Sequence, residues 1–184
     1  ADAYDFVVLV TPVGDYYSGG SLRAVDACVV EEFDRAAPLG VGAVKLAGNY
    51  APDLRPNLET KDRGYPIGLY LDAKTKTFVE EFSTSNLFGI TGGTYVTPQS
   101  DAILPSITND SLMRIAQETL GLAVERRPVP FSELADFSEL AACGTAVVVT
   151  PVAKLRRDEP PSDFLYPAHP VATELYDSIL QIQR

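Results

Sequence analysis

Histidine and cysteine, the side chains that most often bind transition metals, are scarce in this sequence. Its 184 residues include one histidine, His169, and two cysteines, Cys28 and Cys143, which do not form a CxxC pair. Zinc and iron–sulfur sites are built from several cysteine and histidine ligands at characteristic spacings. The sequence therefore predicts no metal site and reduced thiols, as in a cytoplasmic protein.

Long apolar runs and an excess of positive charge are also missing. No uninterrupted apolar stretch reaches the length that spans a bilayer, and the first residues carry no signal-peptide pattern. Lysine and arginine number 15 against 25 aspartate and glutamate residues, which gives a net charge of -10. Because such a surface repels phosphate backbones and anionic lipids, we expect no nucleic-acid partner and no membrane partner.

The rest of the composition is typical of one globular domain. Apolar residues make up 46% of the chain and charged residues 22%, so the chain can bury a substantial core. The first five residues lead directly into an apolar segment without an initiator methionine. We therefore expect the chain to begin inside a larger protein.

Short apolar runs separated by turn residues predict a mixture of strands and helices. Buried strands are expected at 6–10, 27–30, 123–129 and 145–150, and hairpins at 67–81 and 86–96. Helices are expected after Tyr50, with a kink or late start at Pro56 and an end at Gly64, and at 110–120, after Ser132 and at 171–182. Residues 154–170 read as a surface loop. This mixture predicts an α/β or α+β fold with a mixed sheet.

Two motifs carry the chemistry. Lys45 lies between an apolar, strand-like stretch and the turn Gly48-Asn49-Tyr50, where its amine can be held at a cleft, and Glu81 ends a second predicted strand. A lysine and a carboxylate are the groups that a pyridoxal phosphate (PLP) enzyme needs, one for covalent attachment and one as counter-charge for the pyridine nitrogen. Each residue alone reads as an exposed loop or strand-edge residue.

Two further segments suit a phosphate group. Residues 104–110 open a helix, where backbone N–H groups and the Thr108 hydroxyl can bind an anion. The run Cys143-Gly144-Thr145 offers a close backbone approach and another hydroxyl at the start of a strand. Taken singly, Thr108 reads as a helix cap and Gly144 as a strand-entry glycine.

In this order along the chain, the segments resemble the class IV, fold-type IV PLP enzymes, and among them the branched-chain amino acid aminotransferases. The matching runs cover nearly the whole chain: 6–14, Lys-x-x-Gly-Asn-Tyr at 45–50, Glu81 with Thr84 and 86–88, 96–98, Leu-Pro-Ser-Ile-Thr within 103–108, 125–127 and 142–152. The resemblance implies a mixed sheet or pseudo-barrel with surrounding helices.

The resemblance also implies roles for individual residues. Lys45 is similar to the lysine that holds PLP as a Schiff base and then moves the α-proton of the substrate. Glu81 is similar to the carboxylate that keeps the pyridine nitrogen protonated. The other cofactor-binding residues implied are Tyr50 at the phenolic oxygen, Thr84 and Leu104 around the ring, and Ile107, Thr108 and Thr145 at the phosphate. Thr145 and Ala146 are similar to residues that receive the substrate carboxylate.

The family has an N-terminal small domain that supplies an arginine for the phosphate and part of the substrate pocket. The resemblance begins after that domain. We therefore expect residues 1–184 to be the PLP-binding large domain, with the small domain absent from this chain. We expect the chain to have little activity alone and the whole enzyme to be a homodimer.

The sequence is compatible with three functional hypotheses. The first is PLP-dependent transamination of leucine, isoleucine and valine with 2-oxoglutarate, in branched-chain amino acid biosynthesis. The second is a D-amino-acid aminotransferase or aminodeoxychorismate lyase of the same fold, and the third is a non-catalytic truncated domain. The Gly-Asn-Tyr run after Lys45 and the Cys-Gly-Thr-Ala run at 143–146 favour the first.

Overall fold

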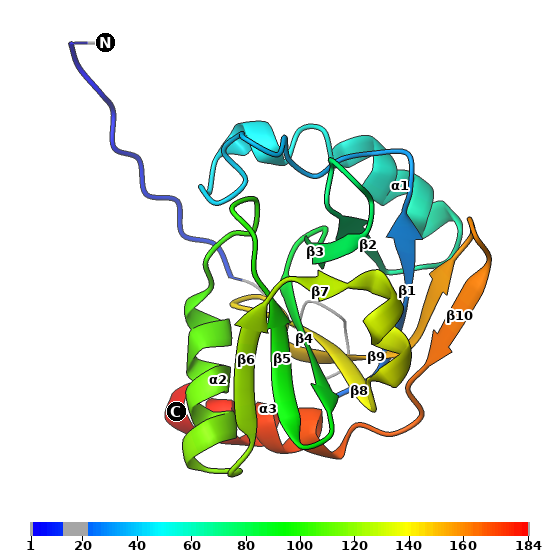
Figure 1. Cartoon of the computed structure of the whole chain (residues 1–184). Coiled ribbons are helices and arrows are strands. Elements are labelled where there is room, and N and C mark those ends of the chain that lie inside the picture. Colours follow the sequence, from blue (N-terminus) through cyan, green and yellow to red (C-terminus); the bar gives the residue numbers. More distant parts are fainter. Residues whose placement is uncertain (1, 13–21, 184) are drawn as a thin grey trace.

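Among residues 2–12 and 22–183, which the computed structural model describes, ten strands form one mixed sheet (Figure 1). The strands are β1 (Val25–Val30), β2 (Ile67–Leu71), β3 (Phe78–Phe82), β4 (Asn86–Thr91), β5 (Thr94–Pro98), β6 (Ala123–Arg127), β7 (Val129–Pro130), β8 (Glu139–Gly144), β9 (Val148–Arg157) and β10 (Ser162–Leu165). Their order is β6-β5-β4-β8-β9-β1-β2-β3-β7, and β10 also pairs with β9.

Parallel and antiparallel pairs coexist in this sheet, as predicted. Strand β1 runs parallel to β2 and β9, and β5 runs parallel to β6. The two predicted hairpins are confirmed, because β2 pairs antiparallel with β3 and β4 with β5. Gly92 and Gly93 form the second turn with φ of 54° and 80°, a conformation that favours glycine.

In the described part of the chain, three α-helices cover the sheet: α1 (Leu54–Asp62), α2 (Ile107–Glu118) and α3 (Pro170–Gln183). Two short 3-10 helices, η1 (Ala47–Asn49) and η2 (Phe131–Asp136), lie in connections. Helix α1 starts late and carries Pro56 near its first turn, and Gly64, with φ of 86°, follows its end. Figure 1 shows α2 and α3 together at one side of the sheet and α1 at the other end of the molecule.

Two apolar clusters form the core. Helices α2 and α3 bury Leu112 and Leu175 against Phe88 and Tyr95 of the β4–β5 hairpin. The second cluster joins β1, β2, β3 and β9 with η2, which contributes Leu134. Together the clusters fix the strand and helix ends that surround the candidate site.

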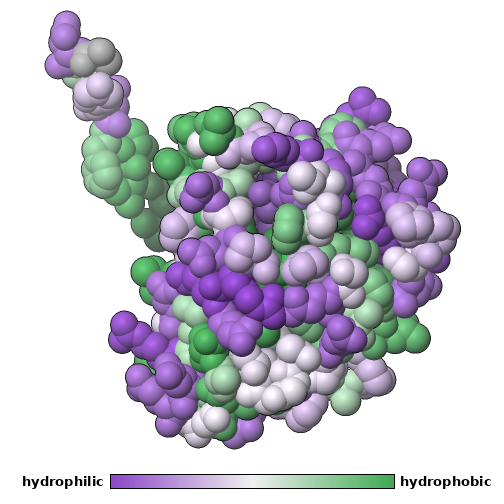
Figure 2. Space-filling view, viewed as in Figure 1, coloured by the Kyte–Doolittle hydropathy of each residue, from purple (hydrophilic) through white to green (hydrophobic). Residues whose placement is uncertain are grey.

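The predicted strand at 6–10 is wrong. Those residues form no strand with the described part of the chain, and Phe6 is 92% exposed. A strand needs a partner edge for its N–H and C=O groups, and local apolar character does not supply one. Figure 2 shows an extended arm with an apolar portion, standing away from the body. Val13 and Gly14, which end this motif, lie outside the described residues.

Two predictions near the C-terminus also fail. Residues 145–147 form a turn, and the strand expected at 145–150 begins only at Val148, because Gly144 pairs with Val148 in a β8–β9 hairpin. The predicted loop at 154–170 contains the end of β9 and all of β10. Lys154 and Arg156 on β9 form ion pairs with Asp163 on β10, and the charged and proline residues at 156–161 give the segment the composition of a loop.

Helix boundaries differ in smaller ways. Helix α2 begins at Ile107, three residues before the predicted start, because the Ser106 hydroxyl accepts a hydrogen bond from the Asn109 N–H at 3.1 Å. Pro130, and not Ser132, precedes η2. The closing helix is confirmed as α3. Within the described ranges, no helix combines the length and apolar character needed to cross a membrane.

Candidate active site

One cavity of about 510 Å³ brings the four predicted segments together. Its wall includes eight of the nine residues singled out from the sequence: Lys45, Tyr50, Glu81, Thr84, Leu104, Ile107, Thr145 and Ala146. The ninth, Thr108, is buried in the first turn of α2 and does not line the cavity. The Ser106 cap of α2 also shows that Thr108 is not the N-cap of this helix.

Lys45 lies in an irregular segment that leads into η1, so the strand-like stretch predicted before it is wrong. The Asn49 side-chain amide donates hydrogen bonds to the carbonyl oxygens of Val41 and Val44, each at 2.8 Å. These bonds fold the chain back on itself next to Lys45. The Lys45 Nζ atom lies 5.7 Å from the centroid of the Tyr50 ring, within the range of a cation–π contact.

Glu81 is a buried acidic residue of the site, at 4% exposure on β3. Its Oε1 atom accepts the Leu104 N–H at 3.3 Å, and its Oε2 atom accepts the Asn86 amide at 3.0 Å. Asn86 also donates to the Leu104 carbonyl at 2.8 Å. Burial raises the pKa of the Glu81 carboxyl to about 7, although the Arg35 guanidinium acts in the opposite direction.

Arg35 is a buried residue at this site that the sequence analysis did not single out. Its Nη1 atom lies 2.9 Å from Glu81 Oε1, and Arg35 is only 9% exposed. The charged stretch Glu31-Glu32-Phe33-Asp34 precedes it, a pattern typical of a surface. Only a contact distant in sequence places this guanidinium at the cavity, so no local pattern could have identified it.

The start of α2 and the β8–β9 turn also line the cavity. Ser106 and Ile107 bring the positive end of the α2 dipole to its wall, where backbone N–H groups lack partners within the helix. Gly144, Thr145 and Ala146 line the wall as the hairpin turn. Val148, which follows this turn, has φ of 53°, a strained conformation for a β-branched residue.

Gly42 allows two walls of the cavity to touch. A Cβ atom added at Gly42 would lie 2.3 Å from the Ala102 carbonyl oxygen, which belongs to the backbone of the facing loop. Gly42→Ala is therefore expected to push the Lys45 segment outward and to lower the free energy of unfolding by about 1–3 kcal/mol. Urea unfolding measures this change. Gly48→Ala is the control, because its nearest neighbour would be the Leu46 side chain at 3.8 Å. Equal losses in the two variants would contradict the explanation.

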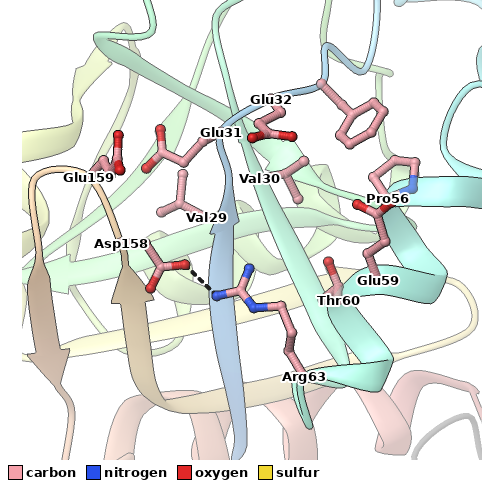
Figure 3. Close-up of a pocket in the computed structure, with 11 residues that line it drawn as sticks. Val29, Val30, Glu31, Glu32, Pro56, Glu59, Thr60, Arg63, Asp158 and Glu159 are labelled. Atoms are coloured by element: carbon pink, nitrogen blue, oxygen red, sulfur yellow. Dashed lines mark hydrogen bonds and ion pairs between the residues drawn. The ribbon is translucent and has the colours of Figure 1, made fainter.

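A second cavity, of about 320 Å³, lies elsewhere on the molecule (Figure 3). Carboxylates dominate its wall: Glu31, Glu32, Glu59, Asp158 and Glu159. The Arg63 guanidinium enters the cavity and forms an ion pair with Asp158 at 2.5 Å. Since none of the residues singled out from the sequence lines it, the larger cavity is the candidate site.

Known proteins resemble this chain in sequence and in fold. The family described as amino-transferase class IV matches residues 11–155. A branched-chain-amino-acid aminotransferase of Helicobacter pylori is 41% identical over 100% of this chain and 54% of its own length.

Two solved structures show the same likeness. The branched-chain amino acid aminotransferase of Escherichia coli has a TM-score of 0.80 and 29% identity, over 94% of this chain and 55% of that one. The PLP form of the branched-chain amino acid aminotransferase from Thermobaculum terrenum has a TM-score of 0.76 and 27% identity, over 87% of this chain and 51% of that one. These likenesses confirm the mixed α/β fold predicted from the sequence. The chain spans about half the length of the relatives it matches.

Proposed function

This chain belongs to the class IV aminotransferases, and we propose that it forms the PLP-binding domain of a branched-chain amino acid aminotransferase. The observation that carries the proposal is the meeting of Lys45 and Glu81 in one cavity. The similar enzymes from Helicobacter pylori and Escherichia coli are both branched-chain amino acid aminotransferases. The proposed substrates are leucine, isoleucine or valine as amino donor and 2-oxoglutarate as acceptor.

The wall of the cavity fits PLP. The Ser85 hydroxyl is buried on this wall without a hydrogen-bond partner among the described residues, and such a group costs free energy unless a ligand or water satisfies it. Glu81 Oε2, which accepts a bond from Asn86, retains capacity for a further donor. The amine of Lys45, the ionisable carboxyl of Glu81 and the start of α2 match the aldehyde, the pyridine nitrogen and the phosphate of this cofactor.

When bound, PLP supplies an electron sink for the negative charge that develops at the substrate Cα. In the proposed site, the Lys45 amine would attach the cofactor and would move the proton at the substrate Cα. The Glu81 carboxylate holds a proton on the pyridine nitrogen. Tyr50 binds the phenolic oxygen, and Thr84 and Leu104 contact the ring.

The phosphate and the substrate are assigned to the start of α2 and the β8–β9 turn. We assign the phosphate to the Ile107 N–H and the Thr145 hydroxyl, with Thr108 behind them in the first turn of α2. Thr145 and Ala146, in the β8–β9 turn, are assigned to the substrate carboxylate. The positive end of the helix dipole favours both anions.

The remaining proposals concern the whole protein. Residues 1–184 act as the cofactor-binding large domain of a cytoplasmic homodimer. Apolar side chains near the Lys45 segment suit such an assembly, since Leu39 is 100% exposed and Leu54 is 67% exposed.

The choice of substrate tests the proposal. The protein that contains this chain is incubated with PLP, 2-oxoglutarate and either L-leucine or D-alanine, and formation of the keto acid is measured. We expect L-leucine to react faster by about 10²-fold or more, since a wrongly oriented substrate loses alignment at the reacting atom. Preference for D-alanine would support a D-amino-acid aminotransferase. No transfer with either donor, although PLP binds, would contradict the proposed activity.

A further inference from the structure

We propose that Arg35 is a positioning residue of this site, which favours the ionised form of the Glu81 carboxylate and joins it to the segment that carries Lys45. The role of Glu81 toward the pyridine nitrogen rests on the proposed function above. The contacts of Arg35 with Glu81 and with two backbone carbonyls are independent of that proposed function.

Arg35 connects three walls of the cavity. Its Nη1 atom forms the 2.9 Å ion pair with Glu81 on β3. Its Nη2 atom donates to the Gly42 carbonyl at 3.4 Å and to the Ala102 carbonyl. Gly42 lies three residues before Lys45, and Ala102 lies in the loop whose Leu104 N–H also reaches Glu81. A planar guanidinium can make these contacts together, whereas a lysine amine cannot reproduce their fork geometry.

The charges around Glu81 explain why a cation is needed there. Burial opposes ionisation of Glu81, and the neighbouring Glu80 carboxyl adds repulsion, while Arg35 and Lys45 favour the ionised form. The buried Cys143 thiol also faces Glu81. Among these groups, Arg35 has the largest effect in favour of the carboxylate. A neutral Glu81 could not act as counter-charge to a protonated ring nitrogen, so loss of Arg35 would remove that function while leaving Glu81 in place.

The first measurement needs no cofactor. The side-chain carboxyl of Glu81 is titrated by carbon-13 NMR in the PLP-free protein, with Glu81→Gln for assignment. We expect the titration midpoint, about 7 in the original protein, to move to higher pH in Arg35→Gln. In Arg35→Lys the midpoint should stay close to the original, but backbone amides of residues 42–50 should exchange faster with deuterium. Arg157→Gln is the matched control: its ion pair with Glu31, also 2.9 Å long, lies outside the cavity, and neither readout should change.

An unchanged midpoint in Arg35→Gln would overturn the inference. Breaking a buried ion pair can unfold a protein, and if Arg35→Gln does not fold, unchanged exchange at residues 42–50 in Arg35→Lys would overturn it instead. A second measurement uses PLP labelled with nitrogen-15 in the ring. We expect its chemical shift to report a loss of ring protonation in Arg35→Gln and retention in Arg35→Lys. If the midpoint of Glu81 moves but labelled PLP does not bind even the original protein, the proposed function fails and the inference about Arg35 stands.

Discussion

Lys45→Ala is expected to lower the rate of amino transfer from L-leucine to 2-oxoglutarate by about 10³-fold or more. The variant loses both the amine that attaches the cofactor and the base that moves the proton at Cα, and a positioned base alone contributes about 10²–10⁴-fold. The rate is measured with saturating PLP, so that weaker binding of the cofactor does not account for the loss. Far-ultraviolet circular dichroism should be unchanged, because Lys45 lies exposed in an irregular segment.

Two other variants control this experiment. Lys74→Ala removes an exposed lysine from the β2–β3 turn, outside the cavity, and should leave the rate unchanged. Lys45→Arg keeps the positive charge but cannot form a Schiff base, so it should be as slow as Lys45→Ala. A Lys45→Ala rate within a few-fold of the original would mean that Lys45 does not carry the chemistry.

Glu81→Gln is expected to lower the same rate by about 10²-fold, the usual loss when one preorganised electrostatic contact is removed from an active site. Glutamine preserves the size of the side chain but cannot balance the charge of a protonated ring nitrogen. Since Lys45 is intact, PLP should still be attached to the protein. The expected phenotype is therefore an occupied but slow enzyme, which absorbance spectra and steady-state rates together distinguish from one that has lost its cofactor.

Glu80→Gln is the matched control for Glu81→Gln. Glu80 is the preceding residue on β3 and is also buried, at 5% exposure, but it does not line the cavity. Its substitution should change the rate much less than substitution of Glu81. Equal losses in the two variants would show that the effect comes from disturbance of β3 and not from a charge facing the cofactor.

The parts of the fold that the sequence predicted are those that local chemistry determines. Both hairpins follow from turn residues, such as Gly92 and Gly93, between runs with high strand propensity. Helix α3 follows from apolar residues at helical spacing, of which Leu175 and Ile179 are buried. In these segments the local pattern and the long-range packing agree.

The two wrong strand predictions, at residues 6–10 and at β10, share one cause, which is that strand pairing is not determined locally. Residues 6–10 have strand propensity but pair with no described strand. Strand β10 lies in a segment rich in charged and proline residues but pairs antiparallel with β9, next to the ion pair between Arg156 and Asp163. Strand pairing depends on which edge is near, and that information is not local. In both cases the contact partner, and not the composition of the segment, decides the structure.

In the candidate site, too, residues in local motifs were predicted and residues placed by long-range contacts were not. Lys45, Glu81, Ile107 and Thr145 were predicted from motifs that together resemble one enzyme family, and the structure brings all four to one cavity. Arg35 was not predicted, because its place at the site depends on a buried ion pair with Glu81, and no sequence motif indicates that contact. Ser85 was missed for a similar reason, since its distinguishing feature is a buried hydroxyl on the cavity wall without a hydrogen-bond partner among the described residues.

The point of covalent attachment tests the central claim most directly. The protein that contains this chain is incubated with PLP, reduced with borohydride to fix any Schiff base, digested and analysed by mass spectrometry. We expect one pyridoxyl group per chain, on the peptide that contains Lys45, and none on that peptide after Lys45→Ala. A pyridoxyl group attached mainly to another lysine, or no attachment at all, would contradict the account.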